Sequence, residues 1–426
     1  MNTAKKLIEI EHPPHVEKAI LARLRLPGDR DWEVDESLDE LRQLAHTAGA
    51  EVVLQVVQYR ERPHPGTLFG EGKIEAMKAS MAELDAQVAI IDGDLTGAQG
   101  SKLEKRLRCK VVDRTQLILD IFAQRAQTRE GKLQVELAQL EYLLPRLAGR
   151  GSIMRQQGGI GVRGPGEQKL EVDRRVIRKR INRLQTELES VRKTRAVQRK
   201  KRVRNTVGSV ALVGYTNAGK SSLLNALTEA GVLVEDKLFA TLDPRVRRRQ
   251  LPGGREILLA DTVGFVRKLP HTLVAAFRAT LEEVNQADLL LLVVDASHPA
   301  MEDHVKAVKA VLAEIKAQDL PILTVYNKSD AVSPETMQSL VDGNLDAVGV
   351  SALHNKGLEE LLRTIDERLA TNRHRVTLRI PQRLSDLAAR VHRDGHVLEE
   401  RYEGNDVLLE AELAPALNAL LSEYIE

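Results

Sequence analysis

The sequence has very little of several things that would point to other classes of protein. Its 426 residues include one cysteine, Cys109, so no internal disulfide can form and a reducing compartment is expected. The longest apolar run, Leu289–Val294, is six residues and far short of the ~18 needed to span a bilayer. Met1–His15 carries charges and two prolines where a signal peptide needs an apolar core. These absences predict a cytoplasmic protein without a membrane span.

Aromatic residues are also scarce, and the charge is unevenly distributed. Aromatics make up 3% of the chain, so stacking on unpaired bases is not expected to be the main mode of binding. The net charge of +2 conceals fourteen Lys and Arg against two Glu between Arg174 and Arg204. It also conceals three Arg against ten Asp and Glu between Ser385 and Glu426. A charge run is usually a solvated helix face, but the basic run is too dense for salt bridges to balance, which favours a polyanionic partner.

Apolar periodicity divides the chain into four parts. Residues 1–115 alternate strand-like and helical patterns, which predicts an α/β domain with a parallel sheet. The expected strands are Ile20–Leu24, Val52–Tyr59, Val88–Ile91 and Lys110–Val112, and the expected helices are Glu36–Ala48, Gly72–Leu84 and Gln99–Leu107. Residues 206–370 form a second α/β domain, and residues 371–426 a small α+β domain. Strands of the second domain are expected at Ser209–Val213, Glu256–Ala260, Leu289–Val294, Ile322–Tyr326 and Ala347–Val350.

Residues 116–205 are expected to form a helical hairpin. Two apolar stripes recur with steps of four and three residues, one at Leu133, Leu137, Leu140, Leu144 and Leu147, the other at Ile177, Ile181, Leu184, Leu188 and Val191. Between them, Gly149–Gly166 holds seven glycines, which predicts a displayed loop. Pro145 is expected to bend or end the first helix near its tip. The residues predicted to contact RNA are Arg150, Arg155 and Arg163 of the loop and Arg178, Lys179 and Arg180 of the second helix.

A phosphate-binding loop opens the second α/β domain. Gly214 to Ser221 has the sequence GYTNAGKS and fits the pattern G-x-x-x-x-G-K-S, preceded by an apolar strand and followed by a helix. The backbone N–H groups of such a loop surround the β-phosphate, and the helix N-terminus adds its dipole. Lys220 is predicted to bridge the β- and γ-phosphates, and the Ser221 hydroxyl to ligate Mg²⁺.

Asn327-Lys-Ser-Asp330 predicts that the base is guanine. It directly follows the strand Ile322–Tyr326, where a carboxylate can accept both the N1–H and the 2-amino group of guanine. Adenine offers no such donor pair, so Asp330 would be left unpaired against it. Asn327 is expected to tie this segment to the phosphate loop, and the stem of Lys328 to cover the base. Ser351-Ala-Leu353 follows the next strand, where a backbone N–H can meet guanine O6.

Two further segments are expected to respond to the γ-phosphate. Asp261-Thr-Val-Gly264 would hold Mg²⁺ through Asp261 and sense the γ-phosphate through the Gly264 N–H. Phe239-Ala-Thr241 supplies Thr241 as a second hydroxyl ligand of the ion.

Phe265 stands where many GTPases place a glutamine that orients water, so low intrinsic turnover is expected. Asn217 either caps the phosphate loop or holds a K⁺ ion near the phosphates, and the sequence leaves both interpretations open.

The predicted site can be set out by role. The residues expected to act in hydrolysis are Lys220, Asn217 and Gly264. Those expected to hold Mg²⁺ are Ser221, Thr241 and Asp261. Those expected to bind nucleotide are Gly214, Tyr215, Thr216, Asn217, Ala218, Gly219, Lys220, Ser221, Ser222, Phe239, Ala240, Thr241, Asp261, Thr262, Val263, Gly264, Asn327, Lys328, Asp330, Ser351, Ala352 and Leu353. GTP and GDP are the expected ligands.

The ordered set GYTNAGKS, FATLD, DTVGF, NKSD and SAL resembles the translation-factor-related class of GTPases, with Phe265 similar to the subgroup that has a hydrophobic residue in place of the glutamine. More specifically, Gly158 to Arg175, GGIGVRGPGEQKLEVDRR, looks like the signature of the bacterial HflX family. The resemblance covers nearly the whole chain. It implies a GTPase that binds the large ribosomal subunit and splits stalled or idle ribosomes, notably under stress, with the glycine-rich loop reaching ribosomal RNA near the peptidyl-transferase region. A monomer is expected.

Three alternatives remain open at this point. One is a ribosome-assembly GTPase that binds subunit precursors. Another is an ATP-dependent RNA remodeller acting through the N-terminal domain, a role linked to some members of the family, although the sequence shows no second phosphate loop. The third is a binding module that does not hydrolyse nucleotide.

Overall fold

A computed structural model describes residues 16–154, 165–203, 208–228, 238–239, 245–267, 284–371, 374–413 and 415–426. The chain divides into two compact units. The first unit comprises Met1–Gln124 and Gln139–Ile181, and the second comprises Arg125–Ala138 and Asn182–Glu426. In the part of the chain that the structure describes, no helix is long and apolar enough to cross a membrane.

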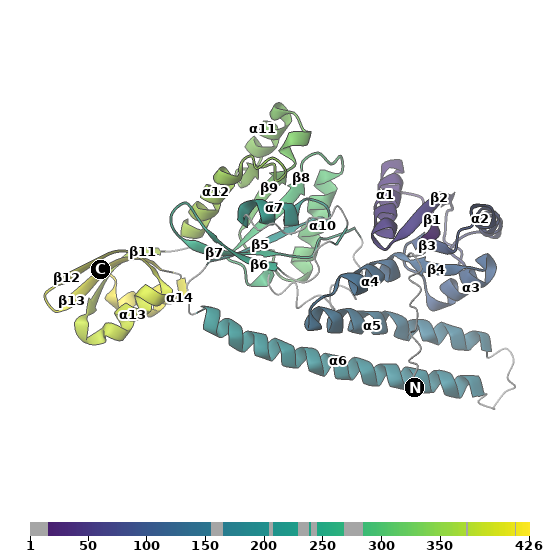
Figure 1. Cartoon of the computed structure of the whole chain (residues 1–426), viewed down its shortest axis with the longest axis horizontal. Helices are drawn as coiled ribbons and strands as arrows, with labels where there is room; N and C mark the ends of the chain where they lie inside the picture. Colours follow the sequence, from purple (N-terminus) through teal and green to yellow (C-terminus); the bar gives the residue numbers. More distant parts are fainter. Residues whose placement is uncertain are drawn as a thin grey trace, which may run out of the picture. The chain divides into compact units, whose positions relative to one another are not determined.

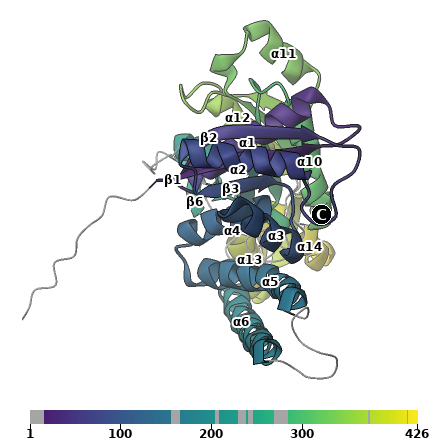
Figure 2. The same cartoon turned by 90° about the vertical axis from the view of Figure 1, so that its right-hand side faces the viewer.

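A four-stranded sheet in the order β2-β1-β3-β4 forms the centre of the first unit (Figures 1 and 2). All its paired strands are parallel, which confirms the predicted α/β class. Its strands are β1 (Glu17–Arg25), β2 (Ala50–Tyr59), β3 (Val88–Asp92) and β4 (Lys110–Asp113). Its helices are α1 (Asp31–Thr47), α2 (Glu71–Leu84), α3 (Gly97–Leu107) and α4 (Arg114–Arg125). A continuous apolar core, from Ile20 and Ala22 of β1 to Leu103 and Leu107 of α3, holds strands and helices together.

Two long helices form the hairpin region, α5 (Arg129–Met154) and α6 (Pro165–Val203). The predicted apolar stripes are buried in part: Leu133, Leu137, Ile181, Leu184 and Leu188 are buried, and the remaining members of both stripes are half-buried. The predicted start of the loop at Gly149 is wrong, because α5 continues helically through Pro145 to Met154.

Contacts to the sheet hold the distal half of α5. Within the first unit, the Tyr142 hydroxyl donates to Asp113 Oδ1 at 2.6 Å and Arg146 donates to Asp113 Oδ2 at 2.8 Å. The Arg146 backbone also packs against Gly97, where an added Cβ would lie 2.6 Å from the Arg146 carbonyl oxygen. These contacts anchor the residues that flank Pro145, so the proline does not end the helix.

A six-stranded sheet in the order β10-β9-β8-β5-β7-β6 organises the nucleotide-binding part of the second unit (Figure 1). Five strands are parallel, and β6 pairs antiparallel with β7 at the edge. The strands are β5 (Gly208–Gly214), β6 (Arg245–Gln250), β7 (Glu256–Asp261), β8 (Leu289–Asp295), β9 (Ile322–Asn327) and β10 (Ala347–Gly349). The helices are α7 (Lys220–Thr228), α10 (Met301–Glu314), α11 (Pro334–Asp342) and α12 (Leu358–Thr371). Buried apolar side chains line both faces of the sheet, in agreement with the almost purely apolar sequences of β5 and β8.

The chain ends in a three-stranded antiparallel sheet in the order β11-β13-β12. The strands are β11 (His374–Pro381), β12 (His396–Glu403) and β13 (Asp406–Leu413), with helices α13 (Ser385–Asp394) and α14 (Pro415–Leu420). Alternate residues of β13 are buried, as expected for a sheet with one covered face. This agrees with the predicted α+β segment.

Candidate nucleotide-binding site

The phosphate loop connects β5 to the N-terminus of α7, as the sequence predicts. Gly214 and Gly219 both have positive φ, +157° and +90°. A Cβ at Gly214 would lie 2.3 Å from the Val293 carbonyl oxygen, and one at Gly219 would lie 2.2 Å from Asn327 Nδ2. Both positions therefore require glycine for backbone conformation and for space. The tight turn directs the first N–H groups of α7 into the loop, where they can bind a phosphate.

Lys220 is folded into the phosphate loop. Its ammonium donates to the carbonyl oxygens of Gly214 at 3.0 Å and Tyr215 at 2.8 Å. Burial lowers the pKa of Lys220 to about 8, and the nearby Asp261 carboxylate opposes this shift only in part. A phosphate in the loop would supply the negative charge that this desolvated ammonium needs, which is the usual role of a phosphate-loop lysine.

Two of the three predicted Mg²⁺ ligands lie together. The Ser221 hydroxyl donates to Asp261 Oδ2 at 2.7 Å, and Asp261 is only 1% exposed at the end of β7. A hydroxyl and a carboxylate are hard oxygen donors of the kind Mg²⁺ prefers beside substrate phosphates, so the pair fits this ion. Thr241, the third predicted ligand, and Ala240 lie outside the described residues. Their neighbour Phe239 is buried and has a φ of +55°.

The segment after Asp261 pairs with the phosphate loop through its backbone. The Thr216 N–H donates to the Phe265 carbonyl at 2.7 Å, and the Phe265 N–H donates to the Gly214 carbonyl at 3.1 Å. Gly264 lies so close to the loop that an added Cβ would be 2.7 Å from Thr216 Cγ2. A movement of the Gly264 N–H toward a γ-phosphate would therefore act directly on the loop.

Three side chains in this segment are buried within the protein. The Thr262 hydroxyl donates to the Leu212 carbonyl at 2.6 Å, and Thr262 is fully buried. Val263 is buried as well. Phe265, 2% exposed, packs in the apolar core on the face that also holds Val294 and Leu312. Phe265 is therefore part of the apolar core, and its ring offers no polar group to a water. The sequence pattern alone did not reveal this burial.

Asn327 joins the predicted base-binding segment to the phosphate loop. Its side-chain amide donates to the Ala218 carbonyl at 2.9 Å and accepts from the Ala352 N–H at 3.1 Å. Asn327 is 2% exposed, so both hydrogen bonds are protected from water. Lys328 has a φ of +61°, and its ammonium lies 2.6 Å from Asp295 Oδ2. Burial tends to raise the pKa of Asp295, but the hydrogen bonds from Lys328 and Ser297 outweigh it and hold the pKa below its usual value.

Asp330 is held in place by the segment that follows β10. The buried Ser351 hydroxyl donates to Asp330 Oδ1, and this hydrogen bond lowers the pKa of Asp330. The His354 ring nitrogen Nε2 lies 3.9 Å from the other carboxylate oxygen, and the His354 backbone N–H donates to Ser351 Oγ at 3.2 Å. The carboxylate is thus kept ionised, as guanine recognition requires. Leu353 is 77% exposed, in a segment predicted to meet the base.

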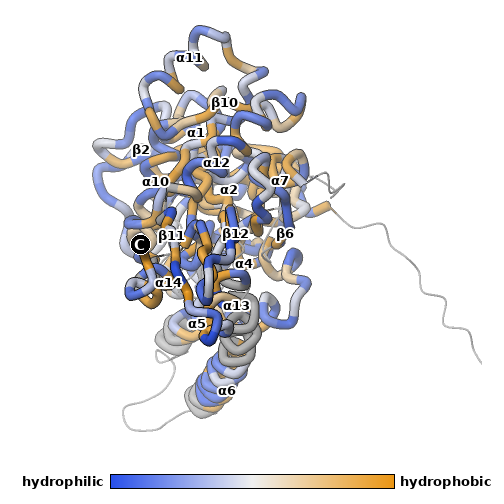
Figure 3. Tube along the Cα trace, turned by 90° about the vertical axis from the view of Figure 1, so that its left-hand side faces the viewer, coloured by the Kyte–Doolittle hydropathy of each residue, from blue (hydrophilic) through white to orange (hydrophobic). Residues whose placement is uncertain are grey.

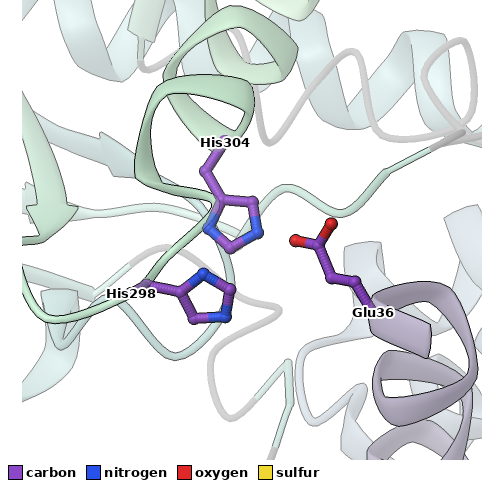
Figure 4. A group of neighbouring side chains, drawn as sticks. All are labelled: Glu36, His298 and His304. Atoms are coloured by element: carbon purple, nitrogen blue, oxygen red, sulfur yellow. The ribbon is translucent and has the colours of Figure 1, made fainter. Parts of the chain in front are cut away.

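An aromatic stack next to the phosphate loop was not predicted. The rings of Tyr215 and His304 are stacked, with centroids 3.7 Å apart. The ring centroid of His298 lies 4.4 Å from that of His304, and Figure 4 shows these two histidines. The Tyr215 hydroxyl accepts from the Arg267 N–H at 2.7 Å, two residues beyond Phe265. Burial, together with the charges of His298 and Arg267, lowers the pKa of His304 to about 4, so this ring is neutral near pH 7. The sequence does place Tyr215 directly after Gly214 in the phosphate loop, but nothing in it indicates that this ring stacks on His304.

The predicted RNA-contacting residues are described only in part. Arg178 and Lys179 are exposed on α6, and Arg180 is half-buried there. Arg150 lies within α5, so its predicted place in a loop is wrong. Arg155 and Arg163 lie outside the described residues.

Known proteins resemble the chain over nearly its whole length. Residues 35–123 match a family model described as GTP-binding GTPase N-terminal, and residues 125–202 match GTP-binding GTPase Middle Region. Residues 209–328 match a model described as 50S ribosome-binding GTPase. GTPase HflX of Lacrimispora saccharolytica is 46% identical over 98% of both chains, and GTPase HflX of Escherichia coli is 45% identical over 88% of both. A Sulfolobus solfataricus GTP-binding protein, solved in complex with GDP, is 26% identical over 84% of this chain and 99% of its own, with a TM-score of 0.45.

Proposed function

Because the chain belongs to the HflX family of GTPases and is a GTP hydrolase, we propose that it binds the large ribosomal subunit in its GTP-bound form and separates the subunits of stalled or idle ribosomes. The observation that carries this proposal is the match of residues 209–328 to a family described as ribosome-binding. The exposed basic residues of α6 support it, because a dense positive charge is suited to RNA phosphates.

The proposed site would use its own residues in distinct roles. Lys220 would bind the β- and γ-phosphates. Asp330 would recognise guanine by accepting hydrogen bonds from its N1–H and 2-amino groups. Ser221 and Asp261 would hold Mg²⁺, which supplies charge neutralisation on the phosphates when bound. The Gly264 N–H would respond to the γ-phosphate, and Thr241 would complete the ligand set from a segment outside the described residues.

The position of Phe265 argues that the chain needs a partner for fast hydrolysis. A buried phenyl ring can neither orient water nor stabilise charge. Phe265 therefore cannot activate the attacking water, as a glutamine at this position does in other GTPases. We infer low turnover for the chain alone and stimulation by the large subunit. A slow GTPase that a large partner stimulates behaves as a timed switch.

The test is GTP hydrolysis with and without purified large subunits, combined with light scattering of intact ribosomes. Stimulated turnover together with a fall in scattering is the expected result. Ser221→Ala should lose the stimulation, because it removes a ligand of the ion and leaves the other regions of the chain unchanged. If stimulation occurs without subunit separation, and loss of the protein in cells leaves immature subunits, the chain is a ribosome-assembly GTPase instead.

We also propose that Asn217 takes part in binding a K⁺ ion. Asn217 is exposed in the phosphate loop with a φ of +61°, a conformation that asparagine tolerates better than most residues. Its side-chain oxygen would supply one ligand beside the phosphates. Basal hydrolysis is then expected to rise when K⁺ replaces Na⁺ at constant ionic strength, and Asn217→Ala should abolish the difference. Equal rates in the two salts would leave Asn217 as a cap of the loop.

A further inference from the structure

The strand β6 (Arg245–Gln250) carries an unusual concentration of positive charge. Four of its six residues are arginines and none is acidic. It is the last strand in the order of the six-stranded sheet, so no described strand pairs with its outer side. Arg247 and Arg248 are exposed and Arg245 is half-buried. All of its residues except Val246 are hydrophilic in the hydropathy colouring (Figure 3).

We propose that β6 is a second RNA-contacting surface of this protein, which binds the sugar–phosphate backbone of ribosomal RNA independently of the helical hairpin. The inference rests on the proposed function, since it takes the RNA to be that of the large subunit. It concerns a different element of the chain from α6 and a different unit from Arg178 and Lys179.

The sign of the charges on β6 favours a polyanionic partner. Arg248 lies 3.4 Å from Glu256 of β7, but both side chains are well exposed, so this pair holds the arginine only weakly. Charged residues on an edge strand also prevent pairing with other sheets, but charge of either sign would serve that purpose. Protection of the sheet edge therefore does not explain why every charge on β6 is positive.

The composition of the strand favours phosphates over bases. Alternate residues of a strand point to opposite sides, so the arginines lie on both sides of the sheet edge and can follow a backbone that runs along it. Arginine binds phosphate oxygens through two parallel hydrogen bonds. The strand has no aromatic residue on which a base could stack.

The register of β6 places this surface next to the nucleotide site. Arg245 pairs with Asp261, the residue whose carboxylate meets Ser221. The strand also begins four residues after Thr241 in the sequence. Thr241 and Asp261 are both predicted Mg²⁺ ligands. RNA bound along β6 would therefore restrain the strand that follows Thr241 and pairs with Asp261. A large partner could favour the hydrolytic arrangement through this contact, without inserting a residue into the site.

The experiment compares large-subunit binding by the full chain and its Arg247→Gln/Arg248→Gln variant, with a non-hydrolysable GTP analogue present. Sedimentation at several salt concentrations should show binding weakened about tenfold, and a salt dependence shallower by about two units of slope, one for each arginine that no longer binds a phosphate. A matched control is Arg375→Gln/Arg401→Gln, which removes the same charge from arginines that each contact a glutamate through two nitrogens at 2.6–2.9 Å, Glu410 and Glu399. The control should bind as the unaltered chain does, and all three proteins should bind GTP equally.

A photo-crosslinking amino acid at the position of Arg248 identifies what lies against the strand. Crosslinks to ribosomal RNA are expected. Crosslinks only to ribosomal protein would overturn the proposal, because the partner would then be an acidic protein surface. Unchanged affinity and salt slope in the double variant would also overturn it and leave the proposed function intact. If the unaltered chain itself does not bind large subunits, the proposed function fails and the inference fails with it.

Discussion

Asp330 is expected to decide which base the site accepts. Its carboxylate is held ionised by Ser351 and can accept two hydrogen bonds from guanine. Asp330→Asn replaces one acceptor by a donor, which suits the carbonyl of xanthine. The affinity for GTP should fall by about 1–3 kcal/mol, the usual cost of a polar group that the bound base covers and leaves without a partner, while xanthosine triphosphate should bind better.

Competition binding with the two nucleotides measures this change. Asp319→Asn, which alters an exposed carboxylate on the loop before β9, serves as a control and should leave the preference for GTP unchanged. A variant at Asp330 that still prefers GTP over xanthosine triphosphate would contradict the assignment of this residue to the base.

At this scale the sequence predicts the residues that act through fixed local spacing. The phosphate loop, Asp261 and Asn327 all occupy the places that their motifs predict, because each motif begins at the last residue of a strand in one sheet. Contacts that depend on distant segments could not be predicted. The stack of Tyr215 on His304 joins residues 89 apart in the sequence, and the burial of Phe265 depends on how α10 packs on the sheet. No local pattern encodes either one.

At the scale of helices and strands, Arg255 connects the nucleotide-binding sheet to the C-terminal sheet. It lies in the turn between β6 and β7, is 9% exposed and donates to Glu412 of β13 at 2.8 Å. In the same turn, the Gly253 N–H donates to Asp366 of α12 at 2.9 Å. The turn thus joins the strand that ends at Asp261 to both α12 and β13. A change in this strand on hydrolysis would reach the C-terminal sheet through Arg255.

Arg255→Met should loosen this connection, because Glu412 would lose its cation in a poorly hydrated place. We expect a loss of about 1–3 kcal/mol in the stability of the second unit and faster hydrogen exchange in β13. Thermal unfolding and hydrogen exchange measure the two effects. Arg401→Met removes an arginine from an exposed pair with Glu399 and should change little. Equal behaviour of the two variants would show that Arg255 makes no special connection.

Elements with a clear apolar period were predicted well, and the others were not. The four strands of the first sheet and both long helices lie close to their predicted places. The strand β6 was not predicted, because five of its six residues are polar and it pairs through its backbone alone. Nor was α4, whose apolar residues are buried directly after β4 without an intervening turn. The extension of α5 past Pro145 depends on contacts of Tyr142 and Arg146 with Asp113, which the sequence does not place side by side.

Both long helices contribute to both units, since the division falls after Ala138 in α5 and after Ile181 in α6. The nucleotide site draws every described residue from the second unit, while the N-terminal part of α6 belongs to the first. We call residues 155–164, which join α5 to α6, the hairpin tip. At the scale of the molecule, a mutation in the tip can therefore test its predicted contact with RNA without altering the nucleotide site.

The last prediction removes the hairpin tip and tests whether it takes part in subunit separation. Because α5 ends at Met154 and α6 begins at Pro165, the change is replacement of residues 155–164 by a short Gly-Ser linker, which preserves both helices. GTP binding should be unchanged, because the described residues of the nucleotide site lie between Gly214 and Leu353. Subunit separation, followed by light scattering, should fall strongly.

A second variant separates charge from shape. Arg155→Gln/Arg163→Gln keeps the length and the glycines of the segment, which allow backbone conformations that larger residues forbid. It should retain part of the activity and bind large subunits more weakly, with a shallower salt dependence, because two fewer arginines would neutralise phosphates. If the linker variant separates ribosomes as fast as the unaltered chain, the tip is a structural connection only. The action on ribosomes would then have to be assigned to the second unit, whose candidate RNA-binding surface is β6.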